Sequence, residues 1–362
     1  LWELDQCIND RGVSIDAQLV SEAIDFDVRL KGQFSAEFID LSGIQNPKSD
    51  PQLKHWIENQ EGFLPSSLAK DVLPDVIADV KSPTVKRVLR LKQLMSKTSV
   101  KKYEAMERAC CDDGRVRGLL RYYGANRTGR WAGKLVQAQN LPRNSMEELD
   151  DVRGLLRSGN ADAIEMIYDH PLDVLSQLIR TAFVPRDGCR FMVADFSAIE
   201  ARVIAWLAGE KWRMDVFADG GDIYCASASK MFGVPVEKHG INGHLRQKGK
   251  IAELALGYQG GVPALKAIGA DKLGLSDEEL REIISSWRKA SPHIKQLWYD
   301  VGNAAFEAVA EHTTVNLHRG IRFSCRSGML FIRLPSGREL AYARPRIEPD
   351  PTRDRDGVTY MD

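Results

Sequence analysis

The chain has 362 residues, no net formal charge, 43% hydrophobic and 28% charged residues, enough for two or three packed subdomains of an ordinary globular protein. No apolar run approaches the ~20 residues that span a bilayer, and residues 1–20 mix charges throughout, so neither a membrane protein nor a secretory signal is indicated. Six scattered cysteines form no C-x-x-C pair, which argues against a zinc site or disulfide framework and fits a reducing cytoplasm. Because the chain begins at Leu1 rather than Met, we expect further residues upstream.

The zero net charge hides an asymmetry along the chain. Residues 1–80 carry 6 Lys and Arg against 15 Asp and Glu, a net charge of −9, whereas residues 81–134 carry 15 against 4, a net charge of +11. A charge run is more often a solvated helix face than a binding surface, but here tyrosines and a tryptophan are interleaved with the basic residues. A polyphosphate backbone is the natural partner of such a surface.

The first half of the chain is predicted to be mainly helical. Residues 1–80 should form helices separated by the breaks NPKSDP and FLPSSL, and residues 83–122 hold one long basic helical pattern. The glycine-rich GANRTGRWAGKLVQAQNLPRN has no helical period and is expected to form loops and short strands. Residues 147–182 return to helix.

The second half mixes helices and strands. CRFMVADF is predicted to be a strand, SAIEARVIAWLAG the helix after it, and HLRQKGKIAELALGY a helix ended by Gly260 and Gly261. SDEELREIISSWRKA carries a capping box, Ser276 with Glu279. GMLFIRLPSGRELAYARPRIE alternates about a Pro-Ser-Gly turn and predicts a β-hairpin. The sequence therefore indicates a mixed α+β fold.

One carboxylate, Asp195, follows the apolar run FMVA where the expected strand leaves its sheet. Ser197 and Glu200 form S-x-x-E, a capping box that would start the next helix. Asp195 can be an ordinary turn residue and Glu200 an ordinary cap. Alternatively, a carboxylate held beside a helix N-terminus binds a divalent cation, and the following N–H groups face phosphate oxygens. Spacing alone leaves both interpretations open.

A second candidate group lies in HLRQKGKIAELALGYQGG. Arg246 and Lys250 are four residues apart, which is ~6 Å along one face of a helix. That spacing suits neighbouring phosphates of a triphosphate, because arginine supplies a fork and lysine a point charge. Tyr258 lies twelve residues after Arg246. The alternative is a solvated basic face, but the apolar residues from Ile251 to Leu256 indicate that this helix packs on something, with its cations at the edge of a cleft.

Four ordered segments resemble the family A DNA polymerases, the bacterial DNA polymerase I type. ADFSAIEAR looks like motif A, R-Q-K-G-K-x7-Y like motif B, RTGRWAGKLVQAQNLPR like the T-G-R … Q-N-I-P segment, and DIYCASASKMFGV like the linking D-I-H segment. The order and spacing of these segments agree with the family over residues 90–345, and their residues are most similar to those of phage or prophage members. The resemblance implies a right-hand polymerase fold of thumb, palm and fingers with an antiparallel palm sheet, acting in a bacterial or phage-infected cytoplasm.

The resemblance also implies a domain division and an activity. Residues 1–80 would be an N-terminal helical region leading to the thumb, 81–122 the thumb, 123–212 the palm with motif A, 213–312 the fingers with motif B, and 313–362 palm strands that stop before motif C. The activity would be template-directed addition of deoxyribonucleotides to a primer 3′-OH. Two Mg²⁺ ions would be the cofactors, and primer–template DNA and a dNTP the partners.

Residue roles follow from the same resemblance. Asp195 would be the catalytic residue that binds both Mg²⁺ ions, helped by the carbonyl of Phe196. The residues implied to bind the nucleotide are Arg246, Lys250, Leu254, Tyr258, Glu200 and Tyr224. Those implied to contact DNA are Lys97, Lys101, Lys102, Thr128, Arg130, Gln139, Asn140, Arg143 and Gln247.

Three positions depart from the family pattern. Leu254 stands where many relatives have an aromatic residue, Tyr224 replaces a His expected to touch the triphosphate, and Gln259 takes the place of the glycine after Tyr258. We expect altered nucleotide selectivity, with poorer discrimination by base stacking, and an unchanged reaction type.

The second carboxylate that two-metal catalysis requires is not found. Relatives supply it in the His-Asp-Glu of motif C, and no His of this chain is followed by Asp. The chain stops at TYMD, so the remaining palm was left out of this sequence or a second polypeptide supplies it. The tail acids are expected to be solvated and unable to substitute: Asp350, Asp354, Asp356 and Asp362.

Two other functions compete with templated DNA synthesis. A non-catalytic primer–template-binding module would keep the fold and lose activity with its second acid, although pure binding needs neither Asp195 nor the triphosphate-facing pair Arg246 and Lys250. A single-subunit RNA polymerase shares related motifs, but a carboxylate at Glu200 would block a ribose 2′-OH.

Overall fold

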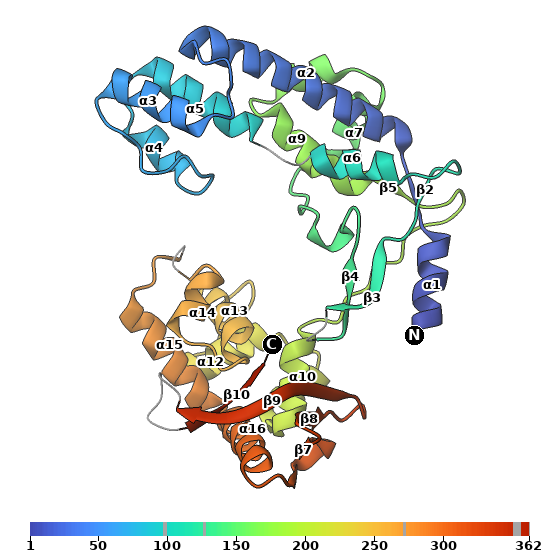
Figure 1. Ribbon diagram of the computed structural model, residues 1–362, viewed down its shortest axis with the longest axis vertical. Coiled ribbons are helices and arrows are strands. Elements are labelled where there is room, and N and C mark those ends of the chain that lie inside the picture. Colours follow the sequence, from blue (N-terminus) through green and yellow to red (C-terminus); the bar gives the residue numbers. More distant parts are fainter. Residues whose placement is uncertain (97–99, 126–127, 271–272, 350–355, 362) are drawn as a thin grey trace. The chain divides into compact units, whose positions relative to one another are not determined.

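The structure is a computed structural model that describes residues 1–96, 100–125, 128–270, 273–349 and 356–361. It divides into two compact units, unit 1 (Leu1–Met192) and unit 2 (Val193–Asp362). Figure 1 shows the elements of both units, coloured by their position in the sequence. Each is described by itself.

Unit 1 is mainly helical. Its elements, in chain order, are α1 (Trp2–Arg11), β1 (Val13–Ile15), α2 (Ala17–Ser42), α3 (Asp50–Glu61), α4 (Leu73–Asp79), α5 (Pro83–Met95), α6 (Val100–Ala109), β2 (Arg115–Val116), β3 (Leu120–Ala125), β4 (Arg130–Gly133), η1 (Ala138–Asn140), α7 (Leu149–Arg157), α8 (Ala161–Ile167), α9 (Pro171–Leu178), η2 (Ile179–Ala182) and β5 (Phe183–Val184).

Helix α2 joins the two hydrophobic cores of unit 1. Its 26 residues make a rod ~39 Å long. The carboxylate of Asp16 caps its start by accepting a hydrogen bond from the Leu19 N–H (3.2 Å), and Gly43, with φ 71°, ends it in the left-handed conformation that glycine adopts without strain. Phe26 packs with α6, α7 and α9, whereas Phe38 packs with α3, α4 and α5.

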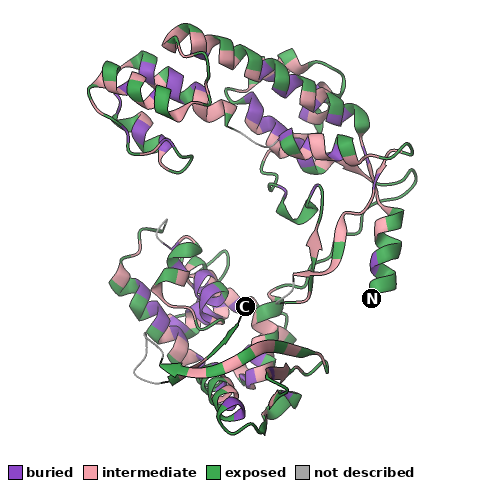
Figure 2. Cartoon of the chain, viewed as in Figure 1, coloured by how far each residue is buried: buried purple, intermediate pink, exposed green. Residues whose placement is uncertain are grey.

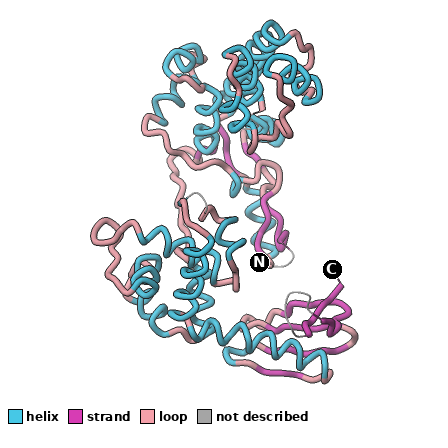
Figure 3. The backbone as a smooth tube through the Cα atoms, turned by 90° about the vertical axis from the view of Figure 1, so that its left-hand side faces the viewer, coloured by secondary structure: helices cyan, strands magenta, loops and turns pink. Residues whose placement is uncertain are grey.

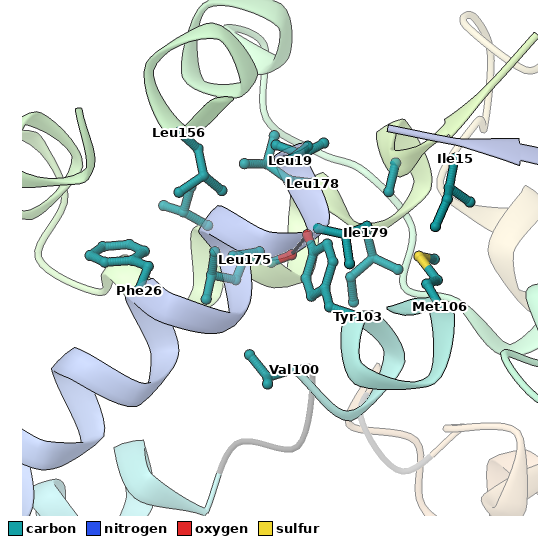
Figure 4. Packing of buried hydrophobic residues seen from close by; sticks show 14 of the residues in the cluster. Ile15, Leu19, Phe26, Val100, Tyr103, Met106, Leu156, Leu175, Leu178 and Ile179 are labelled. Carbon is teal, nitrogen blue, oxygen red and sulfur yellow. Dashed lines mark hydrogen bonds between the residues drawn. The ribbon is translucent and has the colours of Figure 1, made fainter. Parts of the chain in front are cut away.

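The first of these cores contains one buried hydroxyl. Figure 4 shows the Tyr103 ring among aliphatic side chains from α2, α7 and α9. Its hydroxyl donates a 2.7 Å hydrogen bond to the Leu175 carbonyl oxygen, so the polar atom is satisfied where water cannot reach it. Burial raises the pKa of Tyr103 well above its usual range.

Two small antiparallel sheets complete unit 1. In the first, β1 pairs with both β2 and β5. In the second, β3 pairs with β4 to form a hairpin. Helix α1 supports this hairpin: the Asn9 side chain bonds both the N–H and the carbonyl of Leu120, and the Trp131 indole N–H donates to the buried Asp5 carboxylate (2.7 Å).

Unit 2 combines a helical part with a sheet. Its elements are α10 (Ile199–Ala208), α11 (Lys211–Ala218), α12 (Ile223–Phe232), α13 (Leu245–Leu256), α14 (Val262–Ala267), α15 (Asp277–Ala290), α16 (Pro292–Ala310), β6 (Thr314–Asn316), η4 (His318–Gly320), β7 (Arg322–Arg326), β8 (Met329–Arg333), β9 (Glu339–Pro349) and β10 (Asp356–Met361).

The sheet of unit 2 is antiparallel, in the order β10-β9-β8-β7-β6, and α16 packs along it (Figure 3). Ala304 and Ala308 of α16 are buried against Phe323 of β7 and Leu330 of β8. Small residues on the helix let it lie close to the larger side chains of the strands.

The helical part of unit 2 has its own core, formed mainly by α13 and α15, and Figure 2 shows its buried residues. A charged pair lies inside it. Arg213 is fully buried and donates to the Glu253 carboxylate (2.6 Å) and the Ser291 hydroxyl (2.8 Å), while the Trp287 indole N–H donates to the other Glu253 oxygen (2.8 Å). A buried pair of this kind is tolerated only because each ion has hydrogen-bond partners.

The mixed α+β class and most predicted elements are confirmed. The Ser276 capping box forms: the Ser276 side chain accepts a hydrogen bond from the Glu279 N–H, and the Glu279 side chain accepts one from the Ser276 N–H. Strands β8 and β9 make the expected hairpin. The long basic helix predicted over residues 83–122 is wrong: the chain forms two helices, α5 and α6, and then the strand β2 and the start of β3. The helix expected to run to Gly260 ends at Leu256, and residues 257–259 form a turn. Among the described residues, no helix is long and apolar enough to cross a membrane.

Candidate nucleotide site and nucleic-acid surface

Helix α13 presents one partly exposed stripe that contains the predicted triphosphate-binding residues, of which Arg246 and Lys250 are half-buried. Its buried positions are Gly249, Ile251, Ala252, Glu253, Ala255 and Leu256. Arg246, Lys250 and Leu254 follow one another at four-residue steps, each turned ~40° from the last, on the opposite side. Leu254 is 40% exposed. The apolar residues after Lys250 do pack as predicted, except Leu254, which lies with the cations.

The guanidinium of Arg246 is held by a carboxylate of the preceding helix. Its Nε donates to Asp222 Oδ2 (2.8 Å). Asp222 also caps α12, since its Oδ1 accepts from the N–H groups of Tyr224 (2.9 Å) and Cys225 (3.3 Å). Burial alone would raise the pKa of Asp222, but the Arg246 bond and the two capping N–H groups together hold that pKa below its usual value. The same bond raises the pKa of Arg246.

Tyr224 and Gly249 bring these two helices together. The guanidinium carbon of Arg246 lies 5.3 Å from the Tyr224 ring centroid, within cation–π range. A Cβ on Gly249 would lie 2.2 Å from the Tyr224 carbonyl oxygen, so only glycine permits this approach of α13 to α12. Tyr224 was predicted to bind the triphosphate, whereas Asp222 and Gly249 were not predicted to belong to this site. A glycine inside a strong helical pattern was the available signal.

The end of the stripe departs from regular helix. Tyr258 lies after α13 and is 67% exposed. Gln259 adopts φ 62°, a left-handed conformation that costs an L-residue ~1–2 kcal/mol and glycine nothing. The glutamine noted as a departure therefore keeps the backbone turn that glycine would make. Gln247, predicted to contact DNA, is exposed one residue from Arg246.

The predicted strand before Asp195 is wrong. Residues 185–198 form no strand, and Phe191, Met192 and Val193 are 50%, 82% and 94% exposed. A strand exists only when its backbone groups pair with a neighbour, and within the described ranges no strand pairs with this run. Asp195 and Phe196 are consequently exposed in irregular coil.

The capping box predicted for Ser197 and Glu200 is also wrong. Ala198, at φ 49°, is the N-cap of α10, so the helix starts one residue later than the S-x-x-E spacing requires. The Arg202 guanidinium instead donates to the Ser197 carbonyl (2.8 Å). Glu200 remains exposed in the first turn of α10, where a carboxylate interacts favourably with the helix dipole. Burial is the main cause that raises the pKa of Tyr224, and the charge of Glu200 makes a smaller contribution in the same direction.

Asp195 can supply some, but not all, of the ligands that a Mg²⁺ ion requires. Mg²⁺ is commonly held by one or two carboxylates together with substrate phosphates and water, so a single exposed carboxylate next to the exposed residue Phe196 can supply part of such a site. No cluster of three His, Cys, Asp or Glu side chains able to hold a metal occurs among the described residues. For the two ions that the resemblance implies, the structure shows one exposed carboxylate, Asp195.

In unit 1, the T-G-R and Q-N segments lie together. Thr128 is exposed in the connection between β3 and β4, and Arg130 is exposed at the start of β4. The Gln139 amide covers Gly133 of β4, where an added Cβ would lie 2.1 Å from its Oε1. Asn140 donates to the Gln137 side chain (3.1 Å) and is exposed, as is Gln139.

The segment after this turn is anchored by cations. Lys102 donates to the Val136 carbonyl (2.7 Å), so it fixes the loop rather than projecting freely. Arg180 donates to the carbonyls of Leu141 (2.8 Å) and Pro142 (2.6 Å), a support that sequence analysis missed. Arg143 and Lys101 are exposed. Lys97 lies outside the described residues.

Part of the basic charge of unit 1 is neutralised internally. Arg87 forms a bidentate pair with Glu37 (2.6 and 2.7 Å), and Lys92 pairs with Asp50 (2.5 Å). The acidic residues of segment 1–80 therefore offset some of the +11 of segment 81–134, and a polyanion is not required to hold α5 in place. The Glu37 pKa is lowered by the Arg87 hydrogen bond.

Comparison with known proteins identifies the class. The family model described as "DNA polymerase family A" matches residues 27–323. The chain belongs to DNA polymerase family A.

Individual relatives agree with this assignment. The DNA polymerase of Bacillus phage SP02 is 56% identical over 360 residues, which is 99% of this chain and 55% of the phage protein. DNA polymerase I of Rhizobium leguminosarum is 36% identical over 118 residues, 32% of this chain and 11% of that protein. The chain thus spans about half the length of the phage relative, and much less of the bacterial one.

One solved structure shares the fold. It is described as the POL domain of Pol1 from M. smegmatis in complex with DNA primer-template and dNTP. It matches with a TM-score of 0.55 and 19% identity, over 86% of this chain and 49% of that one.

Proposed function

We propose that residues 1–362 form part of the core of a template-directed DNA polymerase that adds deoxyribonucleotides to a primer 3′-OH. The partly exposed stripe of α13 carries the proposal: Arg246, Lys250 and Leu254 share one face, at the spacing of phosphates and a base, on a helix whose opposite face is buried. A purely structural helix has no need for a fork, a point charge and an exposed apolar residue in that order.

The chain's own residues would act mainly by positioning and by neutralising charge, as phosphoryl transfer requires. Arg246 would hold the triphosphate through its fork and Lys250 through its ammonium, for which no paired carboxylate occurs in the described part of the chain. Leu254 and Tyr258 would border the incoming base pair. Glu200 would exclude a ribose 2′-OH.

Asp195, with the Phe196 carbonyl, would hold Mg²⁺. When bound, two such ions activate the 3′-OH and stabilise the departing pyrophosphate. We propose that a second carboxylate comes from a polypeptide segment other than those described. Thr128, Arg130, Gln139 and Asn140 would contact the primer–template through its backbone and minor groove, which carry little sequence information and suit an enzyme that copies any template. The cytoplasm of a bacterial or phage-infected cell is the proposed location.

Primer extension tests the function. The chain is assayed with Mg²⁺, a primer–template and dNTPs, with and without a downstream polypeptide, alongside Asp195→Asn and the matched control Asp219→Asn, an exposed acid after α11. A metal supplies several kcal/mol of transition-state stabilisation, and each 1.4 kcal/mol is tenfold in rate. Asp195→Asn should therefore lower extension at least ~100-fold, and Asp219→Asn should not change it.

The outcomes separate the competing functions. Template-directed extension that depends on Asp195 supports the proposal. Primer–template binding with no extension under either condition would identify a non-catalytic binding module instead. Incorporation of ribonucleotides as readily as deoxyribonucleotides would contradict the role of Glu200 and favour an RNA polymerase.

A further inference from the structure

The Asp222–Arg246 pair has a geometry that leaves the arginine usable. Asp222 commits Oδ1 to the two N–H groups that start α12 and offers only Oδ2 to Arg246. That oxygen engages Nε, whereas the end of the guanidinium, with its two terminal nitrogens, is the edge that pairs with a phosphate in fork geometry. The Arg246 side chain is 25% exposed, so it is held but not closed off.

We infer that Asp222 is a positioning residue that orients Arg246 toward the incoming triphosphate, an inference that rests on the proposed function of Arg246. The Asp222 carboxylate at Nε and the Tyr224 ring at its face hold the guanidinium, and the close approach of α13 to α12 at Gly249 keeps the two helices that carry these groups together. An arginine side chain loses rotamer freedom worth ~2 kcal/mol when it is fixed. Here that ordering occurs before the nucleotide arrives, which favours binding by preorganisation.

A competing possibility is that Asp222 occupies the place of a phosphate and must be displaced. The geometry argues against it, because a phosphate mimic would use both oxygens on the fork, and one oxygen of Asp222 is already held by the capping bonds. Lys250, on the same stripe, adds positive charge that the Asp222–Arg246 pair does not cancel.

The test uses substitutions that separate the two tasks of Asp222. Asp222→Asn keeps an oxygen for the capping bonds and removes the charge. Its amide N–H cannot accept a hydrogen bond from the Arg246 Nε–H, because both groups are donors. Asp222→Ser keeps only a cap, since its hydroxyl is too short to reach Arg246. Asp222→Ala removes both. Arg246→Ala removes the proposed phosphate ligand itself.

The readout is equilibrium binding of the next complementary dNTP to the full chain on a primer–template with a dideoxy-terminated primer, with Mg²⁺ present. It requires no catalysis. We expect Asp222→Asn and Asp222→Ser to weaken dNTP binding ~10–100-fold, by analogy with other hydrogen bonds to charged groups, while their melting temperatures stay near that of the unchanged protein. Adding Asp222→Asn to Arg246→Ala should cause no further loss, because Asp222 acts through Arg246.

The inference and the proposed function fail in different ways. If Arg246→Ala leaves dNTP binding unchanged, the proposed function of the α13 stripe is wrong. If Arg246→Ala weakens binding but Asp222→Asn does not, Asp222 is only a helix cap and the inference is overturned. Tighter dNTP binding by Asp222→Asn, or additive losses in the double variant, would equally overturn it.

Discussion

Replacing Gly249 with alanine probes the contact on which the proposed nucleotide site depends. A Cβ at this position would lie 2.2 Å from the Tyr224 carbonyl oxygen, 3.1 Å from the Ala228 Cβ and 3.2 Å from the Ala228 nitrogen. The first distance must widen by at least about 0.8 Å, since such contacts are essentially never closer than 3.0 Å. The obstacle is backbone rather than a flexible side chain, so α13 itself must move away from α12.

The size of the effect follows from two opposing contributions. Overpacking a close contact costs ~1–3 kcal/mol, and alanine in place of glycine inside a helix returns up to ~1 kcal/mol. We expect Gly249→Ala to lower the free energy of unfolding by ~1–2 kcal/mol. In domains of 150–250 residues this is a fall in melting temperature of roughly 2–8 °C.

Gly302→Ala is the matched control in the same unit. Gly302 also lies inside a helix, α16, and nothing is within 4 Å of the Cβ that it would gain. Only the helix-propensity gain remains, so this variant should melt at or slightly above the unchanged protein. Tryptophan fluorescence is a suitable probe, because the Trp287 indole is buried and bonded to Glu253 of α13.

Nucleotide binding gives an independent measure of the same displacement. If α13 moves by most of an ångström, Arg246 separates from Asp222, and dNTP binding should weaken in Gly249→Ala at temperatures where the protein is fully folded. Gly302→Ala should bind as before. Gly249→Ala that melts no lower than Gly302→Ala and binds dNTP normally would refute the reasoning about this contact.

Two further substitutions test the interiors of the units. Tyr103→Phe removes the hydroxyl that donates to the Leu175 carbonyl (2.7 Å) and leaves that buried oxygen without its bond, so chemical denaturation should show a loss of ~1–2 kcal/mol in unit 1; an unchanged midpoint would contradict this. Glu253→Gln removes the counter-charge of fully buried Arg213 and should cost ~3–5 kcal/mol. Its control, Glu278→Gln, breaks only an exposed 3.4 Å ion pair and should cost at most ~1 kcal/mol; equal losses in both would argue that burial is unimportant.

Local signals in the sequence predicted much of the fold. The capping box of Ser276 and Glu279 and the turn between β8 and β9 depend on residues within a few positions of each other, and both form. The partly exposed face of α13 was also predictable, because the spacing of Arg246 and Lys250 is a property of the helix itself.

Features that depend on distant partners were not predictable. The FMVA run has the composition of a strand, but a strand needs a neighbour, and hydrophobicity does not say whether one is present. Asp222 and Arg246 are 24 residues apart, and their pairing follows from the packing of α12 on α13. Ser197 failed as a cap because Ala198 takes a left-handed conformation that its residue type does not favour.

The two sides of the proposed site differ in how the chain holds them. Arg246 is fixed by contacts within unit 2, so the nucleotide-facing side is organised by α12 and α13 alone. Asp195 lies in exposed coil beside apolar residues that no described strand pairs. Fixing the backbone of each such residue costs ~1–2 kcal/mol, which pairing with a strand would offset by burying their side chains. The position of the Asp195 carboxylate therefore depends on whether a strand pairs with the FMVA run. The position of the proposed triphosphate ligands on α13 does not depend on such a strand.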